Sequence, residues 1–284
     1  MDLGHHIGIM TSLETTLRLF GSSAPVYQIF LTVPRGFSAL RFYPSDIQKS
    51  SKVVQEYGFK IIVHSSYLIN LCRHPHEEPH HKGVQLLIHD LNESVVLGTV
   101  GVVVHLGKNV HGLPTEQAID NYVRGIRYAL RESDCRSNII IETGAGQGTE
   151  IRTKLEDLYK LREKFTDMEK QRIKICLDTC HMFAAGYNLG SRKYVRFLST
   201  WIEILFGWHN IAVVHLNDSK QGLGSRRDNH ADIGRGNIKL KGLLELVRIC
   251  NEKKVPMVLE TPGENGFGPN EQIQFIKEQL KVKK

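Results

Sequence analysis

The chain contains 284 residues, of which 41% are hydrophobic and 24% charged, and its formal net charge is +7. No apolar run reaches the roughly 18–20 residues of a membrane span, and the N-terminus lacks the basic and apolar regions of a signal peptide. We therefore expect an intracellular protein of the cytoplasm or the nucleus, not a membrane or secreted protein. The positive charge favours a polyanionic partner such as nucleic acid.

The five cysteines argue against a disulfide framework, because their number is odd and their spacing is unpaired. Cys176 and Cys180 flank the end of an apolar run. We expect both to be buried thiols that do not form a cysteine-based zinc site.

Short apolar runs rich in β-branched residues recur along the whole chain, and each has the length of a buried strand. They occupy residues 5–9, 26–31, 60–66, 100–107, 138–144, 173–181, 211–218 and 255–262.

Segments with helical periodicity lie between these runs. Thr11 and Glu14 form a capping-box pattern at a helix start. Ser45 and Thr115 are also expected to precede helices, and Gly58 is expected to end one. The helices are expected over residues 13–20, 46–57, 116–133, 154–165, 194–207, 239–253 and 270–280.

This alternation of strand and helix predicts the fold. Near-continuous apolar strands separated by helices indicate parallel strands that are covered on both faces. Eight such units in a chain of this size favour a (β/α)8 TIM barrel, as a single domain over residues 1–284. An open doubly wound sheet is the competing fold, but no G-x-G-x-x-G motif follows the first strand.

Residues of the type that bind metals stand at the ends of six expected strands, because the apolar runs terminate there. The carboxyl ends of barrel strands meet on one face, so these side chains should converge. Three more follow in the loops: His181, one helical turn after Asp178, and Asp228 and His230 in the glycine-rich loop before residue 238. The six at strand ends are His64, His105, Glu142, Asp178, His215 and Glu260, with gaps of 41, 37, 36, 37 and 45 residues.

The composition of this set indicates a metal cluster. Placing five imidazoles and four carboxylates in one cleft costs free energy, because the carboxylates repel one another and lose their hydration. Bound dications can offset this cost. One histidine after a strand is more often structural, but six consecutive strands are not explained that way. With three or four ligands per ion and one shared carboxylate, the set suits about three ions, Zn²⁺ with Mn²⁺ or Fe²⁺ as alternatives at some positions. No convincing Ser/His or Cys/His pair offers a protein nucleophile.

Long segments of the chain resemble the endonuclease IV family, the zinc-dependent apurinic/apyrimidinic endonucleases of base-excision repair. They are residues 64–71, 102–107, 141–148, 176–187, 215–238 and 258–262, in the family's order.

The resemblance implies a role for each ligand-type residue. By similarity, His64, His105 and Glu142 would hold the first zinc. Glu142 would bridge to a second zinc, which Asp178, His215 and Glu260 also bind, and His181, Asp228 and His230 would hold the third. Glu142 and Glu260 are thereby assigned to the catalytic centre.

The resemblance also implies the reaction. The family flips an abasic nucleotide out of duplex DNA, and such a nucleotide costs little to extrude because it neither stacks nor pairs. A hydroxide shared by two zinc ions would cut the phosphodiester 5′ to it, leaving a 3′-hydroxyl and a 5′-deoxyribose phosphate. Many members also remove blocking groups from 3′ ends, as 3′-phosphatases or 3′-phosphodiesterases. We expect a monomer.

Two loops are expected to contact DNA. Tyr67 and Leu68 lie where the family places one inserting loop, and Arg35 lies in the other. The alternative is that these residues only pack on their own barrel. We expect three further residues to reach backbone phosphates, although each is equally ordinary as a solvated charge. They are Lys220, Arg226 and Arg227.

Two other enzyme or protein classes are compatible with parts of this pattern. Sugar isomerases of the xylose-isomerase type share a metal-bearing barrel, so the fold alone does not exclude them. A module that binds damaged DNA without cutting it would be expected to have lost ligands, and none is lost here. The histidine-rich tract at residues 73–81 is interpreted as a solvated loop, since it contains two prolines and two glutamates.

Overall fold

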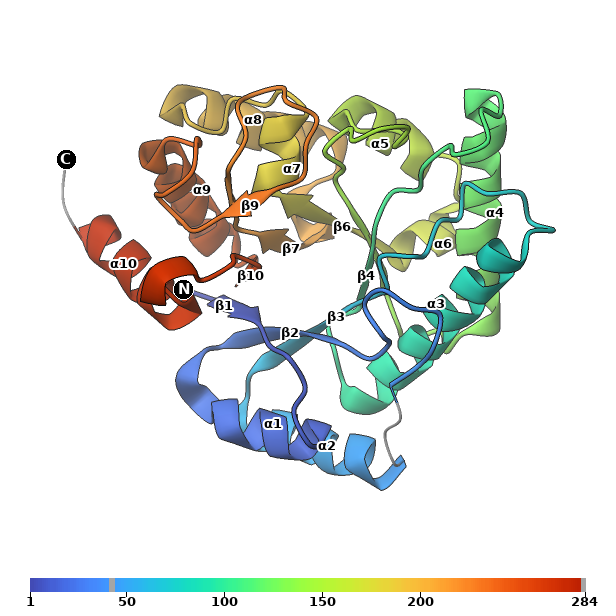
Figure 1. Cartoon of the computed structure of the whole chain (residues 1–284), viewed down its shortest axis with the longest axis horizontal. Helices are drawn as coiled ribbons and strands as arrows, with labels where there is room; N and C mark the ends of the chain where they lie inside the picture. The colour runs from blue at the N-terminus through green and yellow to red at the C-terminus, as the bar shows by residue number, and fades with distance from the viewer. Residues whose placement is uncertain (41–43, 282–284) are drawn as a thin grey trace.

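The computed structural model, which describes residues 1–40 and 44–281, is a closed barrel of parallel strands surrounded by helices (Figure 1). Around the barrel the strands follow the order β1-β10-β7-β6-β5-β4-β3-β2, so the TIM barrel expected from the sequence is confirmed. The barrel strands are β1 (Leu3–His6), β2 (Val26–Phe30), β3 (Lys60–His64), β4 (Val102–Val104), β5 (Ile139–Glu142), β6 (Ile173–Asp178), β7 (Ile211–His215) and β10 (Met257–Leu259).

Helices connect successive strands and cover the outside of the barrel (Figure 1). The last helix, α10, packs beside β1 and so joins the two ends of the chain. The helices are α1 (Leu13–Phe20), α2 (Pro44–Tyr57), α3 (Glu78–Leu97), α4 (Thr115–Glu132), α5 (Leu155–Arg162), α6 (Asp167–Gln171), α7 (Thr179–Ala184), α8 (Arg192–Leu205), α9 (Leu240–Lys253) and α10 (Pro269–Lys281). Two short strands, β8 (Asp218–Ser219) and β9 (His230–Ala231), pair in the long loop after β7.

The inside of the barrel is filled with apolar side chains, one from each strand except β1. At β1 the barrel is too narrow for a side chain, because a Cβ atom on Gly4 would lie 1.7 Å from the carbonyl oxygen of Val26. This packed interior makes a solid floor beneath the carboxyl ends of the strands. The filling side chains are Val26, Ile62, Val103, Ile140, Cys176, Val213 and Val258.

Several expected boundaries are wrong by one to three residues. The first strand spans Leu3–His6 and not residues 5–9, because Leu3 is already paired with Met257. Helix α1 is capped by Ser12, whose hydroxyl accepts from the N–H of Thr15, so the capping box assigned to Thr11 and Glu14 is incorrect.

Two expected helices begin one or two residues earlier than predicted, and the 20-residue helix α3 is absent from the helices expected from the sequence. Ser45 and Thr115 lie inside helices, since α2 begins at Pro44 and α4 at Thr115. The tract at residues 73–81 is a loop only in part, because α3 begins at Glu78 and buries His80. The proline at position 79 fits the first turn of that helix, where its missing N–H costs nothing.

Two further expectations concern the cysteines and membrane association. Cys176 and Cys180 are free and buried, as expected. Within residues 1–40 and 44–281, no helix combines the length and apolar character needed to cross a membrane.

Candidate active site

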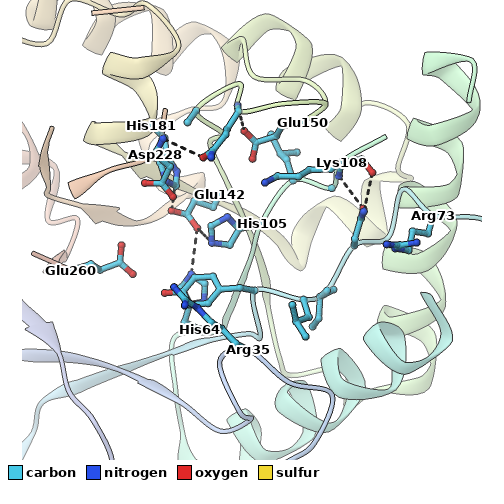
Figure 2. A pocket seen from close by; sticks show the side chains of 18 of the residues that line it. Arg35, His64, Arg73, His105, Lys108, Glu142, Glu150, His181, Asp228 and Glu260 are labelled. Atoms are coloured by element: carbon cyan, nitrogen blue, oxygen red, sulfur yellow. Dashed lines mark hydrogen bonds and ion pairs between the residues drawn. The ribbon is translucent and has the colours of Figure 1, made fainter. Parts of the chain in front are cut away.

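The nine side chains singled out in the sequence lie together at the carboxyl end of the barrel. Figure 2 labels His64, His105, Glu142, His181, Asp228 and Glu260 among them. Four of them are the last residues of β3, β5, β6 and β7, and His105 and Glu260 directly follow β4 and β10. His181 lies in α7, Asp228 lies in the loop between β8 and β9, and His230 is the first residue of β9. Residues as far apart in sequence as His64 and Glu260 therefore form one cluster.

One part of the cluster is formed by His64, His105 and Glu142. The Nε2 atoms of His64 and His105 lie 3.5 Å and 3.2 Å from Oε2 of Glu142. Nδ1 of His64 donates to the carbonyl of Ser65 at 2.8 Å, which leaves its Nε2 free to face the carboxylate. Two imidazole nitrogens thus point at one oxygen of a buried glutamate.

A second part shares the same glutamate. Nδ1 of His215 lies 2.9 Å from Oε1 of Glu142 and 3.1 Å from Oε2 of Glu260. Asp178 is more distant, with its Oδ2 at 3.9 Å from the same nitrogen. Glu142 stands between the two groups and presents one oxygen to each, the arrangement expected of a bridging carboxylate.

A third part contains His181, Asp228 and His230. Oδ1 of Asp228 lies 3.1 Å from Nε2 of His181 and 3.1 Å from Nε2 of His230. Asp178 is both near this group and the N-cap of α7, where its Oδ1 accepts from the N–H of His181 at 2.7 Å. The cap therefore fixes the distance between the end of β6 and the imidazole of His181.

The charges of the cluster depend on one another. Burial would raise the pKa of Glu142, but His105 and His215 outweigh it and hold the pKa well below its usual value. Burial would also lower the pKa of His230, yet Asp228 and the other nearby carboxylates raise it to about 9. In the metal-free cluster, protons on imidazoles balance the carboxylates, and a divalent ion would displace those protons.

Unpartnered polar atoms test whether these residues fit metal ions. Within residues 1–40 and 44–281, four buried ligand-type atoms of the cluster make no hydrogen bond of suitable geometry. Carboxylate oxygens lie 3.1–3.2 Å from the three imidazole nitrogens among them, but at unsuitable angles. Buried polar groups without partners cost free energy, so the convergence of these atoms indicates a site suited to a bound ligand. The residues present fit divalent ions. The four atoms are His105 Nε2, Glu142 Oε2, His181 Nε2 and His230 Nε2.

Two buried amides that the sequence analysis did not identify hold the ligands in place. Gln28 Nε2 donates to Glu260 at 2.6 Å, and its Oε1 lies 2.8 Å from Nε2 of His215. Asn217 Nδ2 donates to Asp178 at 2.7 Å and to Glu260 at 3.2 Å. The only signal in the sequence was that each amide interrupts or ends an apolar run, which does not reveal its partners.

A cavity of about 690 Å³ lies at the carboxyl end of the barrel, and the residues expected to insert into DNA also line it. Arg35, Tyr67 and Leu68 lie at its wall, and the ring of Tyr67 contacts those of His64 and His105, with centroids 5.2 Å and 5.5 Å apart. The two loops are joined, because the N–H of Tyr67 donates to the carbonyl of Pro34. Figure 2 shows Arg35 next to His64, and Arg73 and Lys108 farther along the cavity.

The other three residues expected to contact DNA are Lys220, Arg226 and Arg227. They are exposed and are not among the residues that line this cavity. Lys220 forms an ion pair with Glu264 at 2.6 Å. Arg226 has a positive φ of 54°, and its N–H donates to the carbonyl of Ala184, which anchors the loop beside α7. The structure therefore leaves Lys220, Arg226 and Arg227 on the surrounding surface.

Comparisons with known proteins identify the family. A family model described as a xylose isomerase-like TIM barrel matches residues 26–280. A putative endonuclease 4 from Acanthamoeba polyphaga mimivirus is 34% identical over 290 residues, which covers 99% of this chain and 92% of that protein. The chain belongs to the endonuclease IV family.

Other members of the endonuclease IV family agree with this assignment. A probable endonuclease 4 from Halothermothrix orenii is 33% identical over 268 residues, covering 94% of this chain and 95% of that protein. The crystal structure of endonuclease IV from Thermus thermophilus superposes with a TM-score of 0.84 at 26% identity, over 100% of both chains. The protein is thus a nuclease of DNA repair with a metal-binding rim, as the resemblance implied.

Proposed function

We propose that this protein hydrolyses the phosphodiester bond 5′ to an abasic site in duplex DNA, leaving a 3′-hydroxyl and a 5′-deoxyribose phosphate. One observation supports the proposal: four ligand-type residues with unpartnered buried atoms line one cavity, at whose wall Tyr67 and Arg35 also lie. They are His105, Glu142, His181 and His230. A site for a flipped-out sugar phosphate needs such a recess beside a surface that can replace the lost base.

The proposed ligand sets follow the three parts of the cluster. His64, His105 and Glu142 would hold one zinc ion. Bound zinc supplies Lewis acidity, which lowers the pKa of water to about 7 in favourable sites and neutralises charge on a phosphate. Glu142 also belongs to a second set, completed by Asp178, His215 and Glu260, and the third set is His181, Asp228 and His230.

The chain's own residues then orient the substrate. Glu142 and Glu260 keep their carboxylates in position, because His215 lies within 3.1 Å of both. Tyr67 and Leu68, with 48% and 41% of their surface exposed, are available to fill the stack vacated by the flipped nucleotide. Arg35 would contact the same gap, and Lys220, Arg226 and Arg227 would contact backbone phosphates on the surrounding surface.

The same site should accept related substrates. A blocked 3′ end presents a phosphate to the metal cluster without any need for base flipping, so we include 3′-phosphatase and 3′-phosphodiesterase activity in the proposal. We also propose that residues 1–284 form a single catalytic domain that acts as a monomer on DNA inside the cell.

The test is cleavage of a duplex oligonucleotide that carries one abasic site, with analysis of both new ends. The wild type should make one cut 5′ to the site and leave a 3′-hydroxyl. Glu260→Gln should fold, but its cleavage activity should fall by more than the about 10–100-fold effect of residues that only contact a metal ligand. Glu278→Gln is the matched control, because this glutamate is exposed on α10 and accepts a hydrogen bond from Gln274 of the same helix.

The outcomes separate the proposed reaction from its rivals. Wild-type turnover by Glu260→Gln would refute the ligand assignment. No cut by protein that holds about three ions would refute the proposed reaction, and isomerisation of a sugar or binding of damaged DNA would then be measured on the same sample.

A further inference from the structure

One buried amide contacts the ligand cluster from the side of β2. Gln28 lies in the middle of that strand and is fully buried, with 0% of its surface exposed. Its Nε2 lies 2.6 Å from Oε1 of Glu260 and 3.2 Å from Nδ1 of His6, and its Oε1 lies 2.8 Å from Nε2 of His215. A single side chain thus touches two of the nine ligand-type residues.

The chemistry of the partners determines the orientation of this amide. An ionised carboxylate only accepts hydrogen bonds, so the NH₂ of Gln28 must face Glu260. The amide oxygen then faces His215, and an oxygen can only accept. His215 must therefore carry hydrogen on Nε2 and present Nδ1 to the cluster.

His215 differs in this respect from three other histidines of the cluster. Nδ1 of His64, His181 and His230 lies 2.8 Å, 2.8 Å and 3.2 Å from the backbone carbonyls of Ser65, Thr143 and Glu260. These carbonyls hold hydrogen on Nδ1, so the Nε2 atoms face inward. At His215 a side-chain amide, and not a backbone carbonyl, performs this function and selects the opposite nitrogen.

We propose that Gln28 is a positioning residue that fixes the tautomer of His215 and, through its NH₂ group, the orientation of Glu260. The inference rests on the proposed function, because it assumes that both residues bind the same ion. Groups that orient a metal ligand in this way contribute about 10–100-fold to metal affinity or activity. Gln28 is not among the residues that line the cavity, so its effect on the site would pass through its two partners.

Two substitutions separate the two contacts. Gln28→Met removes both hydrogen bonds at similar volume. Gln28→Glu keeps an acceptor opposite Nε2 of His215 but replaces the donor with a second carboxylate beside Glu260. Gln272→Met is the matched control, because Gln272 is equally buried and its amide contacts Asp232, Ile233 and Phe267, not the cluster.

The measurements are zinc affinity by calorimetry and the imidazole ¹⁵N spectrum of His215 in the zinc-loaded protein. For Gln28→Met we expect the affinity for one of the zinc ions to fall by about 10–100-fold. We also expect the Nε2 signal of His215 to change, because its hydrogen bond to Gln28 is lost. For Gln28→Glu we expect the wild-type tautomer signal with weakened zinc binding. Gln272→Met should alter neither.

The results that overturn the inference differ from those that overturn the proposed function. Wild-type zinc affinity and an unchanged His215 signal in Gln28→Met, or equal losses in Gln272→Met, would refute the role of Gln28. If wild-type His215 shows no zinc-dependent change, or if the loaded wild type does not cut abasic DNA, the proposed function fails on the wild type alone. Should Gln28→Met not fold, a shifted tautomer in Gln28→Glu would by itself refute the inference.

Discussion

At the scale of single residues, four histidines of the cluster each use one ring nitrogen to contact the surrounding protein and turn the other toward the ligand cluster. They are His64, His181, His215 and His230. His181 donates from Nδ1 to the carbonyl of Thr143, and His215 contacts Gln28 through Nε2. A hydrogen bond at one nitrogen fixes the orientation of the imidazole ring. The ring then loses little rotational freedom when its other nitrogen binds a metal ion, which raises metal affinity. The same reasoning applies to Glu260, which contacts both Gln28 and Asn217.

Tyr67 offers a test of substrate discrimination. Its ring is half exposed and lies over His64 and His105 without being a ligand. Tyr67→Ala should reduce the preference for abasic over undamaged duplex by about 10-fold or more, since stacking contributes about 1–3 kcal/mol per base, and should leave the metal content unchanged. Parallel cleavage rates and metal analysis measure both quantities.

The control for that substitution is Tyr128→Ala, because Tyr128 is 41% exposed but lies on α4 outside the described cavity lining. Unchanged discrimination in Tyr67→Ala, or loss of an ion, would show that the ring does not act on DNA.

The convergence of the ligand-type residues could be predicted from the sequence, because six of them end apolar runs. His64 and Glu142 follow apolar strands, and the parallel barrel brings all strand ends to one face. Gln28 could not be predicted, since its two partners come from β7 and from the end of β10, which the chain reaches 187 and 232 residues later. Its role depends on side-chain direction across the closed barrel and not on any local pattern.

At the scale of elements, β1 depends on its glycine. The Cβ of an alanine at position 4 would overlap the backbone of β2, which cannot move without disturbing the pairing of β2 with β3. Gly4→Ala should therefore lower the free energy of unfolding by about 3 kcal/mol or more, or prevent folding. Denaturant unfolding and soluble yield are the measurements.

Gly8→Ala is the control for that prediction, because a Cβ at Gly8 meets nothing within 4 Å. Similar stability of both variants would mean that β1 can shift to accommodate the side chain.

The order and type of most main elements were predictable from the sequence, but the helix α3 and the ends of the elements were not. Apolar runs and helical periodicity extend over many residues, whereas a helix start depends on one hydrogen bond. Ser12 caps α1, although Thr11 had a better pattern with Glu14, because Asp46 of α2 accepts the first N–H groups of the helix at Leu13 and Glu14. That contact between two helices has no signature in the local sequence.

At the scale of the whole molecule, metal ions should stabilise the fold, because their ligands come from six different barrel strands and the following loops. An ion present at about 1,000 times its Kd adds about 4 kcal/mol, and removal by a chelator should lower the Tm by about 10 °C. Calorimetry with and without chelator measures the difference, and restoration by Zn²⁺ but not Ca²⁺ is the control.

The size of this difference should depend on pH. His230 in the metal-free fold has its pKa raised from 6.5 to about 9, so its contribution to stability is complete below pH 6.5 and lost as pH rises through 9. Zinc competes with the same protons, so its affinity rises over that range. The Tm of the loaded protein should therefore exceed that of the chelated protein by more at pH 9 than at pH 6.5, and a difference independent of pH would contradict the ligand role of His230.

The spacing of the ligands along the chain has a consequence for protein synthesis. Glu260 follows the last barrel strand, and β10 is the strand that joins β1 to β7. A nascent chain, or one truncated by a premature stop codon before residue 257, lacks this carboxylate and cannot close the barrel. Closing the barrel and completing the proposed ligand cluster thus depend on the same last strand, so we expect a fragment that ends before residue 257 to lack nuclease activity.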